Sequence, residues 1–252
     1  MPAPPSKGRL KQYRTYRQKK ARDRDGLFVA EGPKIAAELL QHAPGTVRAV
    51  CALDDWWHDH PYLPDAYAGN SYAVKPAELD QLSLFKTPNR VWLLVDRPLP
   101  TLDVELARRQ PTLYLDGLQD PGNVGTILRT ADWFGLRQVV CAPGTVDVFH
   151  PRVTQASMGA FLRINAPVLP VDTLLDQLGE LPVVATVLDG VPLEAARLPV
   201  PGLYGIGNEG NGLSLAFMQH STQRLTIPGG GGAESLNAAV ATGILCAALH
   251  GR

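Results

Sequence analysis

The 252-residue sequence has few of the features that mark a membrane or secreted protein. No run approaches the roughly 18 apolar residues that a membrane-spanning helix requires. The first seven residues, Met1 to Lys7, lack the apolar stretch of a secretory signal. Hydrophobic residues make up 45% of the chain and charged residues 19%, which is ordinary for a globular protein with a buried core. We therefore expect a cytoplasmic protein that does not enter the membrane.

Cysteine is scarce, and potential metal ligands are scattered. The three cysteines, Cys51, Cys141 and Cys246, are far apart among apolar neighbours. Because this spacing is typical of neither a zinc site nor a disulfide framework, we expect reduced thiols in the core. His58 and His60 have no third ligand nearby, so we expect a surface loop there and no bound metal.

Positive charge is scarce outside the first residues, although the net charge of the whole chain is zero. Residues 1–24 contain nine of the 24 lysines and arginines and a single acid, Asp23. This leaves 15 bases and 23 acids for the rest, a net charge of −8. Such an asymmetry predicts a polyanionic partner that approaches from one side.

Two tyrosines, Tyr13 and Tyr16, are interleaved with these cations, which suits phosphate contacts combined with base stacking on RNA. The alternative is a disordered, solvated tail. The cations that we expect to contact RNA are Lys11, Arg14, Arg17, Lys19, Lys20 and Arg22.

The sequence separates into two α/β domains and a linker. Residues 1–95, the N-terminal domain, include a strand-like run at 27–32, a helical pattern through 35–40 and a buried strand at 91–95. Residues 96–111 hold three prolines and several charges, as a linker does. In residues 112–252 short apolar runs alternate with helical patterns, which predicts a largely parallel buried sheet. Its expected strands are 113–115, 139–141, 183–187, 203–206 and 225–227.

Three glycine-rich loops follow strands of this sheet, and ligands bind where loops leave the carboxyl ends of parallel strands. In the first loop, Asp120 can cap a helix that has Pro121 at its first position and ends at Gly135. Arg129 falls opposite the apolar face of that helix. At this position the arginine could be a solvated surface residue or could contact a phosphate or the substrate, and the sequence leaves both alternatives open. The apolar face comprises Val124, Ile127, Leu128, Ala131 and Phe134.

The second loop matches a dinucleotide-binding pattern, G-x-G-x-x-G, at Gly205, Gly207 and Gly210. The acid expected about 20 residues downstream falls in a glycine tract. Glu209 within the loop would also repel a pyrophosphate. A cationic or hydrogen-bond-donating ligand suits this loop better, and a nucleotide-binding α/β protein is the less favoured alternative.

The third loop, residues 227–237, contains four consecutive glycines before an apolar helix from Ala238 to Leu249. We expect Ser235 to cap this helix and Asn237 to lie in its first turn, among free backbone N–H groups. A flexible connector would explain the glycines, and so would close approach of the backbone to a ligand.

Together the loops resemble the three motifs of the SpoU (TrmH-like) class within the SPOUT superfamily of RNA methyltransferases. Upstream, residues 19–32 look like the substrate-binding domain often fused to this class. One departure is Gly229, where the class commonly has a bulky apolar residue after Ile-Pro. The matching residues are Asn123-x-Gly125-x-x-x-Arg129-x-Ala131-x-x-Phe134-Gly135, then Gly207-Asn208-Glu209-Gly210-x-Gly212-Leu213-Ser214, then Ile227-Pro228 and Glu234-Ser235-Leu236-Asn237.

The resemblance implies an enzyme that transfers a methyl group from S-adenosylmethionine to a ribose 2′-hydroxyl of ribosomal or transfer RNA. It implies an α/β fold whose C-terminal parallel-sheet domain forms a deep trefoil knot, behind a small α/β RNA-binding domain, and a homodimer with the site near the subunit interface. Cofactor contacts would come from Gly207, Asn208, Gly210, Ile227 and Leu236, with Val187 and Leu188 as further neighbours.

The class places Arg129 at the reacting hydroxyl. Because an arginine stays protonated at neutral pH, orientation and charge stabilisation are its firm role, and proton abstraction assisted by an RNA phosphate stays open. Asn123, Glu209, Ser235 and Asn237 would organise the pocket through hydrogen bonds. A catalytically silent RNA-binding protein with the same fold is the alternative.

Overall fold

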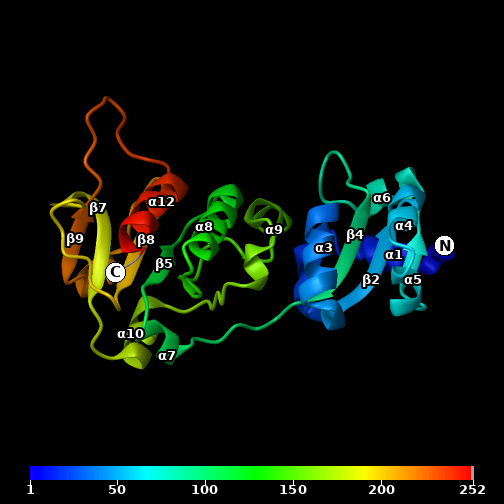
Figure 1. Cartoon of the computed structure of the whole chain (residues 1–252), viewed down its shortest axis with the longest axis horizontal. Helices are drawn as coiled ribbons and strands as arrows, with labels where there is room; N and C mark the ends of the chain where they lie inside the picture. The colour runs from blue at the N-terminus through cyan, green and yellow to red at the C-terminus, as the bar shows by residue number, and fades with distance from the viewer. Residues whose placement is uncertain (251–252) are drawn as a thin grey trace. The chain divides into compact units, whose positions relative to one another are not determined.

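The computed structural model describes residues 1–250 and divides into two compact units (Figure 1). Unit 1 comprises Met1–Pro98 together with Phe149–Gly159, and unit 2 comprises Leu99–Val148 and the residues from Ala160 onward. Most of the segment expected as a linker belongs to unit 2 and contains a short helix, α7 (Val104–Ala107). Within residues 1–250, no helix is both long and apolar enough to span a membrane.

Unit 1 is built on a four-stranded mixed sheet with the order β1-β4-β2-β3. The strands are β1 (Leu27–Glu31), β2 (Val47–Ala52), β3 (Ser71–Ala73) and β4 (Val91–Asp96). The β2–β3 pairing is parallel, and the other two pairings are antiparallel. The strands expected at 27–32 and 91–95 are confirmed. The sequence pattern did not predict β2, which is buried on both faces and shows no alternation, or β3, which is too short to show a pattern.

The helices of unit 1 include the helix expected around 35–40 and two that the basic segment forms. The helices are α1 (Lys7–Thr15), α2 (Lys19–Asp25), α3 (Pro33–His42), α4 (Asp54–Asp59), α5 (Leu63–Ala66), α6 (Pro76–Leu82) and α9 (Pro151–Ser157), with a short 3₁₀ turn at Pro44–Thr46. His58 lies within α4 and His60 caps it, so the loop expected there is wrong.

The basic N-terminal segment is folded onto the core of unit 1, so the disordered-tail alternative is wrong. Tyr13 on α1 and Tyr16 after it are buried in one cluster with Trp92 and Leu94 of β4 and with the apolar face of α6. The rings of Tyr13 and Trp92 lie 5.4 Å apart between centroids. Because Tyr13 and Tyr16 are only 3% and 4% exposed, they cannot stack on RNA bases, and that expectation is also wrong.

Unit 2 is built on a five-stranded sheet in which every pairing is parallel, with the order β6-β5-β8-β7-β9. All five expected strands are confirmed. They are β5 (Thr112–Asp116), β6 (Val139–Cys141), β7 (Val183–Pro192), β8 (Leu203–Gly207) and β9 (Gln223–Thr226). This arrangement, with unit 1, confirms the α/β class. The knot stays a prediction.

The helices of unit 2 are α7, α8 (Pro121–Trp133), α10 (Val171–Leu178), α11 (Leu215–His220) and α12 (Ala238–Leu249), with a 3₁₀ turn at Ala160–Leu162. Tyr114, Ala185 and Leu203 of the sheet share one apolar cluster with side chains of α7, α10 and α11. Helix α8 packs along α12. The three cysteines of the chain are free and buried, as predicted.

Candidate active site

Loop 1, between β5 and α8, leads into a helix with the predicted cap. Oδ1 of Asp120 accepts a 2.7 Å hydrogen bond from the backbone N–H of Asn123, and Pro121 occupies the first helical position. Arg129 is exposed and makes no hydrogen bond or ion pair with any residue from 1 to 250. Its guanidinium is therefore available to a ligand. The predicted apolar face is fully buried at Val124, Ile127, Leu128 and Ala131, whereas Phe134 lies just past the helix and is half-buried.

Loop 2, residues 208–214, turns back on itself around Asn208. The backbone N–H and carbonyl of Asn208 pair with those of Gly212 at 2.9 Å each. Oδ1 of Asn208 accepts hydrogen bonds from the N–H groups of Gly210 and Asn211, at 2.9 and 3.2 Å. Its Nδ2 donates to the carbonyl of Gly117 at 2.9 Å. Asn208 thus shapes loop 2 and joins it to loop 1.

Asp116, the last residue of β5, also holds loop 2, a role that the sequence pattern did not predict. Its Oδ2 accepts a 2.7 Å hydrogen bond from the backbone N–H of Ser214, and the residue is only 8% exposed. The sequence does carry a signal for this role: a carboxylate stands at the end of a buried strand, directly before Gly117, and a buried charge needs a specific partner.

Close packing within the protein explains two glycines of the G-x-G-x-x-G match. A Cβ atom on Gly205 would lie 2.4 Å from the ring of Phe217, and one on Gly207 would lie 2.4 Å from the carbonyl carbon of Gly212. A Cβ on Gly210 would meet nothing nearer than Oδ1 of Asn208, at 3.5 Å. The pattern therefore reflects how β8 and loop 2 pack, which removes the main support for a dinucleotide site.

Side chains from loop 2, from loop 3 and from the first turn of α8, which directly follows loop 1, form one chain of hydrogen bonds. Nδ2 of Asn237 donates to Oδ1 of Asn123 at 2.9 Å, and Nδ2 of Asn123 donates to Oε1 of Glu209 at 2.5 Å. A carboxylate only accepts hydrogen bonds, so the direction of donation runs from Asn237 to Glu209. The structure therefore brings together three of the five residues expected to be catalytic. We call these three residues the polar cluster.

Asn237, and not Ser235, caps the C-terminal helix, so the expected cap is wrong. Oδ1 of Asn237 accepts hydrogen bonds from the backbone N–H groups of Ala239 and Val240, at 2.9 and 3.3 Å. Asparagine and serine are comparable helix caps, and the sequence alone could not separate two candidates so close together. As the cap, Asn237 directs its Nδ2 toward Asn123 and links α12 to α8.

Loop 3 exposes apolar side chains beside these polar groups. Figure 1 shows the loop in orange, leaving β9 before α12. Residues 228–237 are exposed throughout, Leu236 is 48% exposed, and Ile227 is half-buried. Backbone groups and amides can form hydrogen bonds with the polar parts of S-adenosylmethionine, and exposed apolar side chains can pack on its adenine ring.

The remaining predicted contacts lie outside the polar cluster. Ser235 makes no hydrogen bond to it within residues 1–250. On β7, Val187 is half-buried, whereas Leu188 is 73% exposed and is held by its carbonyl, which accepts a 3.0 Å hydrogen bond from Oγ1 of Thr226.

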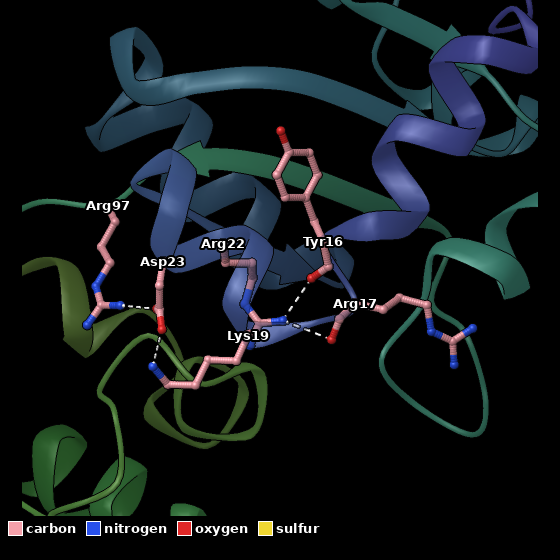
Figure 2. Close-up of polar contacts among 6 residues, drawn as sticks. All are labelled: Tyr16, Arg17, Lys19, Arg22, Asp23 and Arg97. Atoms are coloured by element: carbon pink, nitrogen blue, oxygen red, sulfur yellow. Dashed lines mark hydrogen bonds and ion pairs between the residues drawn. The ribbon is translucent and has the colours of Figure 1, made fainter.

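The cations expected to contact RNA lie on α1, on α2 and in the turn between them, and Figure 2 shows three of them. Five of the six are exposed, but Arg22 is only 8% exposed. Lys19 forms an ion pair with Asp23, which lowers the pKa of that carboxyl. The exposed members are Lys11, Arg14, Arg17, Lys19 and Lys20.

Two family models match the chain. The model described as the SpoU rRNA methylase family matches residues 110–247, and the one described as the MRM3-like substrate binding domain matches residues 7–92. The first match alone covers more than half of the chain, and it includes all three loops.

The chain is also similar to named relatives over nearly its whole length. The 23S rRNA (guanosine(2553)-2′-O)-methyltransferase RlmP of Bacillus subtilis is 29% identical over 248 residues, which cover 96% of each chain. The AdoMet-bound rRNA methyltransferase of Sinorhizobium meliloti is 26% identical, with a TM-score of 0.84 over 98% of this chain and 95% of that one. The SpoU methyltransferase AviRb of Streptomyces viridochromogenes, in complex with AdoMet, is 26% identical, with a TM-score of 0.80 over 96% of each chain.

Proposed function

Because the chain belongs to the SpoU rRNA methylase family, we propose that it transfers a methyl group from S-adenosylmethionine to a ribose 2′-hydroxyl of ribosomal RNA. The observation that carries the proposal is the polar cluster, which joins the three loops at the carboxyl ends of β5, β8 and β9. Ligands of parallel α/β sheets bind at that edge.

The methyl donor supplies an electrophilic methyl group, and the protein has to align the hydroxyl with it and stabilise the charge that develops on oxygen. In our proposal Arg129 does both. Its guanidinium is exposed and is not engaged by another residue between 1 and 250. Asn123, Glu209 and Asn237 hold the surrounding loops in place through their mutual hydrogen bonds, and Ser235 adds a hydroxyl from loop 3.

Cofactor contacts in this proposal come from loops 2 and 3. The backbone of Gly207, Asn208 and Gly210 contacts the cofactor, and the apolar surface of the exposed Leu236 and the half-buried Ile227 suits the adenine ring. Val187 and Leu188 of β7 are further neighbours.

Unit 1 binds the RNA in this proposal, through the exposed cations of α1, α2 and the turn between them. Phosphate contacts of this kind dominate affinity for nucleic acids. The rest of the chain is net acidic, so the basic segment is the natural place for a polyanion. We also propose that the protein acts in the cytoplasm, with the ribosomes.

We further propose that the protein is a homodimer and that α12 lies in the interface. Val240 and Ile244, one turn apart on α12, are 52% and 37% exposed although apolar. The variant Val240→Asp should sediment as a monomer, and Leu215→Asp, at an exposed apolar position on α11, should not change the oligomeric state. A native chain that sediments as a monomer would contradict the proposal.

The decisive experiment incubates the protein with methyl-labelled S-adenosylmethionine and separate pools of 23S rRNA, 16S rRNA and transfer RNA. Nucleoside mass spectrometry should find the label on a ribose of ribosomal RNA. Label on a base, or on transfer RNA only, would contradict the proposal. RNA binding without any methyl transfer would instead support a catalytically silent RNA-binding protein.

A further inference from the structure

Arg22 differs from the other cations of the basic segment because its guanidinium is turned inward. It lies on α2 and is only 8% exposed. Its Nη1 donates hydrogen bonds to the carbonyl oxygens of Tyr16 and Arg17, at 2.7 and 3.1 Å (Figure 2). These carbonyls lie just past the end of α1, where backbone oxygens have lost their helical partners.

The two hydrogen bonds hold the turn that joins α1 to α2. Arg17 lies in this turn, and Figure 2 shows its side chain pointing away from Arg22. Its own Nη1 donates a 3.3 Å hydrogen bond to the carbonyl of Gln81, near the end of α6. Arg17 is therefore held at the backbone by Arg22 and at the tip by Gln81, while its guanidinium stays exposed.

Other cations of this region form ion pairs with carboxylates of the protein and are therefore less available to RNA phosphates. Lys19 is paired with Asp23, which also accepts a 3.0 Å hydrogen bond from Nη1 of Arg97, and Arg24 is paired with Asp25. Among residues 1–250, the predicted RNA contacts that have no carboxylate within ion-pair distance are Lys11, Arg14, Arg17 and Lys20. Two of these, Arg14 and Lys20, flank the turn, and Arg17 lies in it.

We propose that Arg22 is a positioning residue for RNA binding. Its buried guanidinium fixes the α1–α2 turn so that Arg14, Arg17 and Lys20 meet the phosphates of one RNA strand, while Arg22 itself touches no RNA. Fixing the turn before binding lowers the conformational entropy lost when the RNA docks. This inference rests on the proposed function, because it requires that unit 1 binds RNA.

The test compares Arg22→Met, Arg17→Met and the double variant in the full chain, by salt titration of the affinity for purified 23S rRNA. We expect each single variant to weaken binding roughly tenfold, as when one charge-assisted hydrogen bond is removed. The log–log salt slope should flatten by about 0.7 for each phosphate of a single strand that the variant no longer neutralises. Because Arg22 acts through the turn, the double variant should bind no more weakly than the weaker single variant.

Further measurements distinguish a positioning role of Arg22 from an effect of its loss on protein stability or on net charge. In methyl transfer, Arg22→Met should raise the KM for rRNA while the kcat at saturating RNA stays within about twofold of native. Arg24→Met is the matched control, since it removes an arginine from the same helix that is already paired with Asp25; its salt slope should be unchanged. Arg22→Lys keeps the charge, but its ammonium is one bond shorter and should not reach both carbonyls, so its affinity should also fall.

Three results would overturn the inference: native affinity and slope in a folded Arg22→Met protein, additive losses in the double variant, or full affinity in Arg22→Lys. If the methionine variant does not fold by circular dichroism, Arg22→Lys decides alone. If the native protein neither binds nor methylates rRNA, the proposed function and the inference are refuted together. If the native protein methylates rRNA but Arg22→Met has native RNA affinity and salt slope, only the inference is refuted.

Discussion

Nδ2 of Asn123 donates a 2.5 Å hydrogen bond to Oε1 of Glu209, a residue 86 positions later in the sequence. The same Asn123 accepts from Asn237, which caps α12. One asparagine on α8 thus links the loop after β8 to the start of α12. Because both its donor and its acceptor are used, a second acceptor or an apolar group at this position should break the link.

Replacing Asn123 by aspartate tests that link. Asn123→Asp exchanges the donor nitrogen for a carboxylate oxygen beside the carboxylate of Glu209, and the two like charges should repel. We expect methyl transfer to fall at least tenfold below that of Asn123→Ala, which loses the hydrogen bonds without adding repulsion. Initial rates with labelled cofactor measure this, and equal rates in the two variants would contradict it.

Removing the side chain of Arg129 should abolish methyl transfer while leaving the fold intact. It projects from α8 opposite the buried face, so Arg129→Ala should keep its Tm within about 2 °C and its cofactor affinity within a few-fold. We expect kcat to fall by roughly 100-fold or more, as when one charge-stabilising donor is lost. Arg129→Lys should also be poor, because an ammonium lacks the planar fork of donors.

The matched control for Arg129 is Arg137→Ala, which removes an equal charge from an exposed arginine of the same unit. Its turnover should stay near native. Near-native turnover in Arg129→Lys would show that a point charge suffices and that the guanidinium geometry plays no part.

Gly207 and Gly210 should respond differently to alanine. A Cβ at position 207 collides with the backbone of Gly212, so Gly207→Ala should destabilise unit 2 by about 1–3 kcal/mol, as overpacking does. At position 210 a Cβ would make only an ordinary contact with Oδ1 of Asn208, at 3.5 Å, so Gly210→Ala should stay within about 0.5 kcal/mol of native. Thermal unfolding measures both. Calorimetric titration of S-adenosylmethionine into Gly210→Ala then reports on the ligand without a folding defect, and equal destabilisation of the two variants would refute the packing argument.

Glu31 should make the stability of unit 1 fall as pH rises. Burial raises the pKa of this carboxyl, which accepts hydrogen bonds from Ser83 Oγ and from the N–H of Leu84, at 2.6 and 2.7 Å. An acid whose pKa is higher in the folded state binds its proton more tightly when folded, so stability is greatest below the ordinary glutamate pKa and is lost as pH rises through the raised value.

Urea unfolding followed by the fluorescence of the buried Trp56, Trp57 and Trp92 can isolate this contribution. The free energy of unfolding of native protein minus that of Glu31→Gln should become more negative with increasing pH above about 4.5. A difference that is constant over pH 4 to 8 would contradict the assignment.

Local chemistry was sufficient to predict much of this protein from its sequence. The strands β5, β6 and β8 of unit 2 are short, mostly apolar runs that are buried almost throughout, the pattern expected of a strand covered on both faces. The cap at Asp120 and the buried face of α8 depend only on residues within a few positions of one another. The positions of the three loops at the carboxyl edge follow from the parallel order of the strands.

Contacts between distant residues decided the rest. The sequence does not specify that Asn123 bonds to Glu209 and Asn237, or that Asn237 rather than Ser235 caps α12, because each choice depends on where another loop lies. The aromatic and cationic pattern of residues 1–24 predicted RNA stacking, yet Tyr13 and Tyr16 are buried in the core and Arg22 faces backbone carbonyls. A pattern of charges and rings cannot show which side of a helix faces the protein; the apolar surface of β4 and α6 settles that by burying the tyrosines.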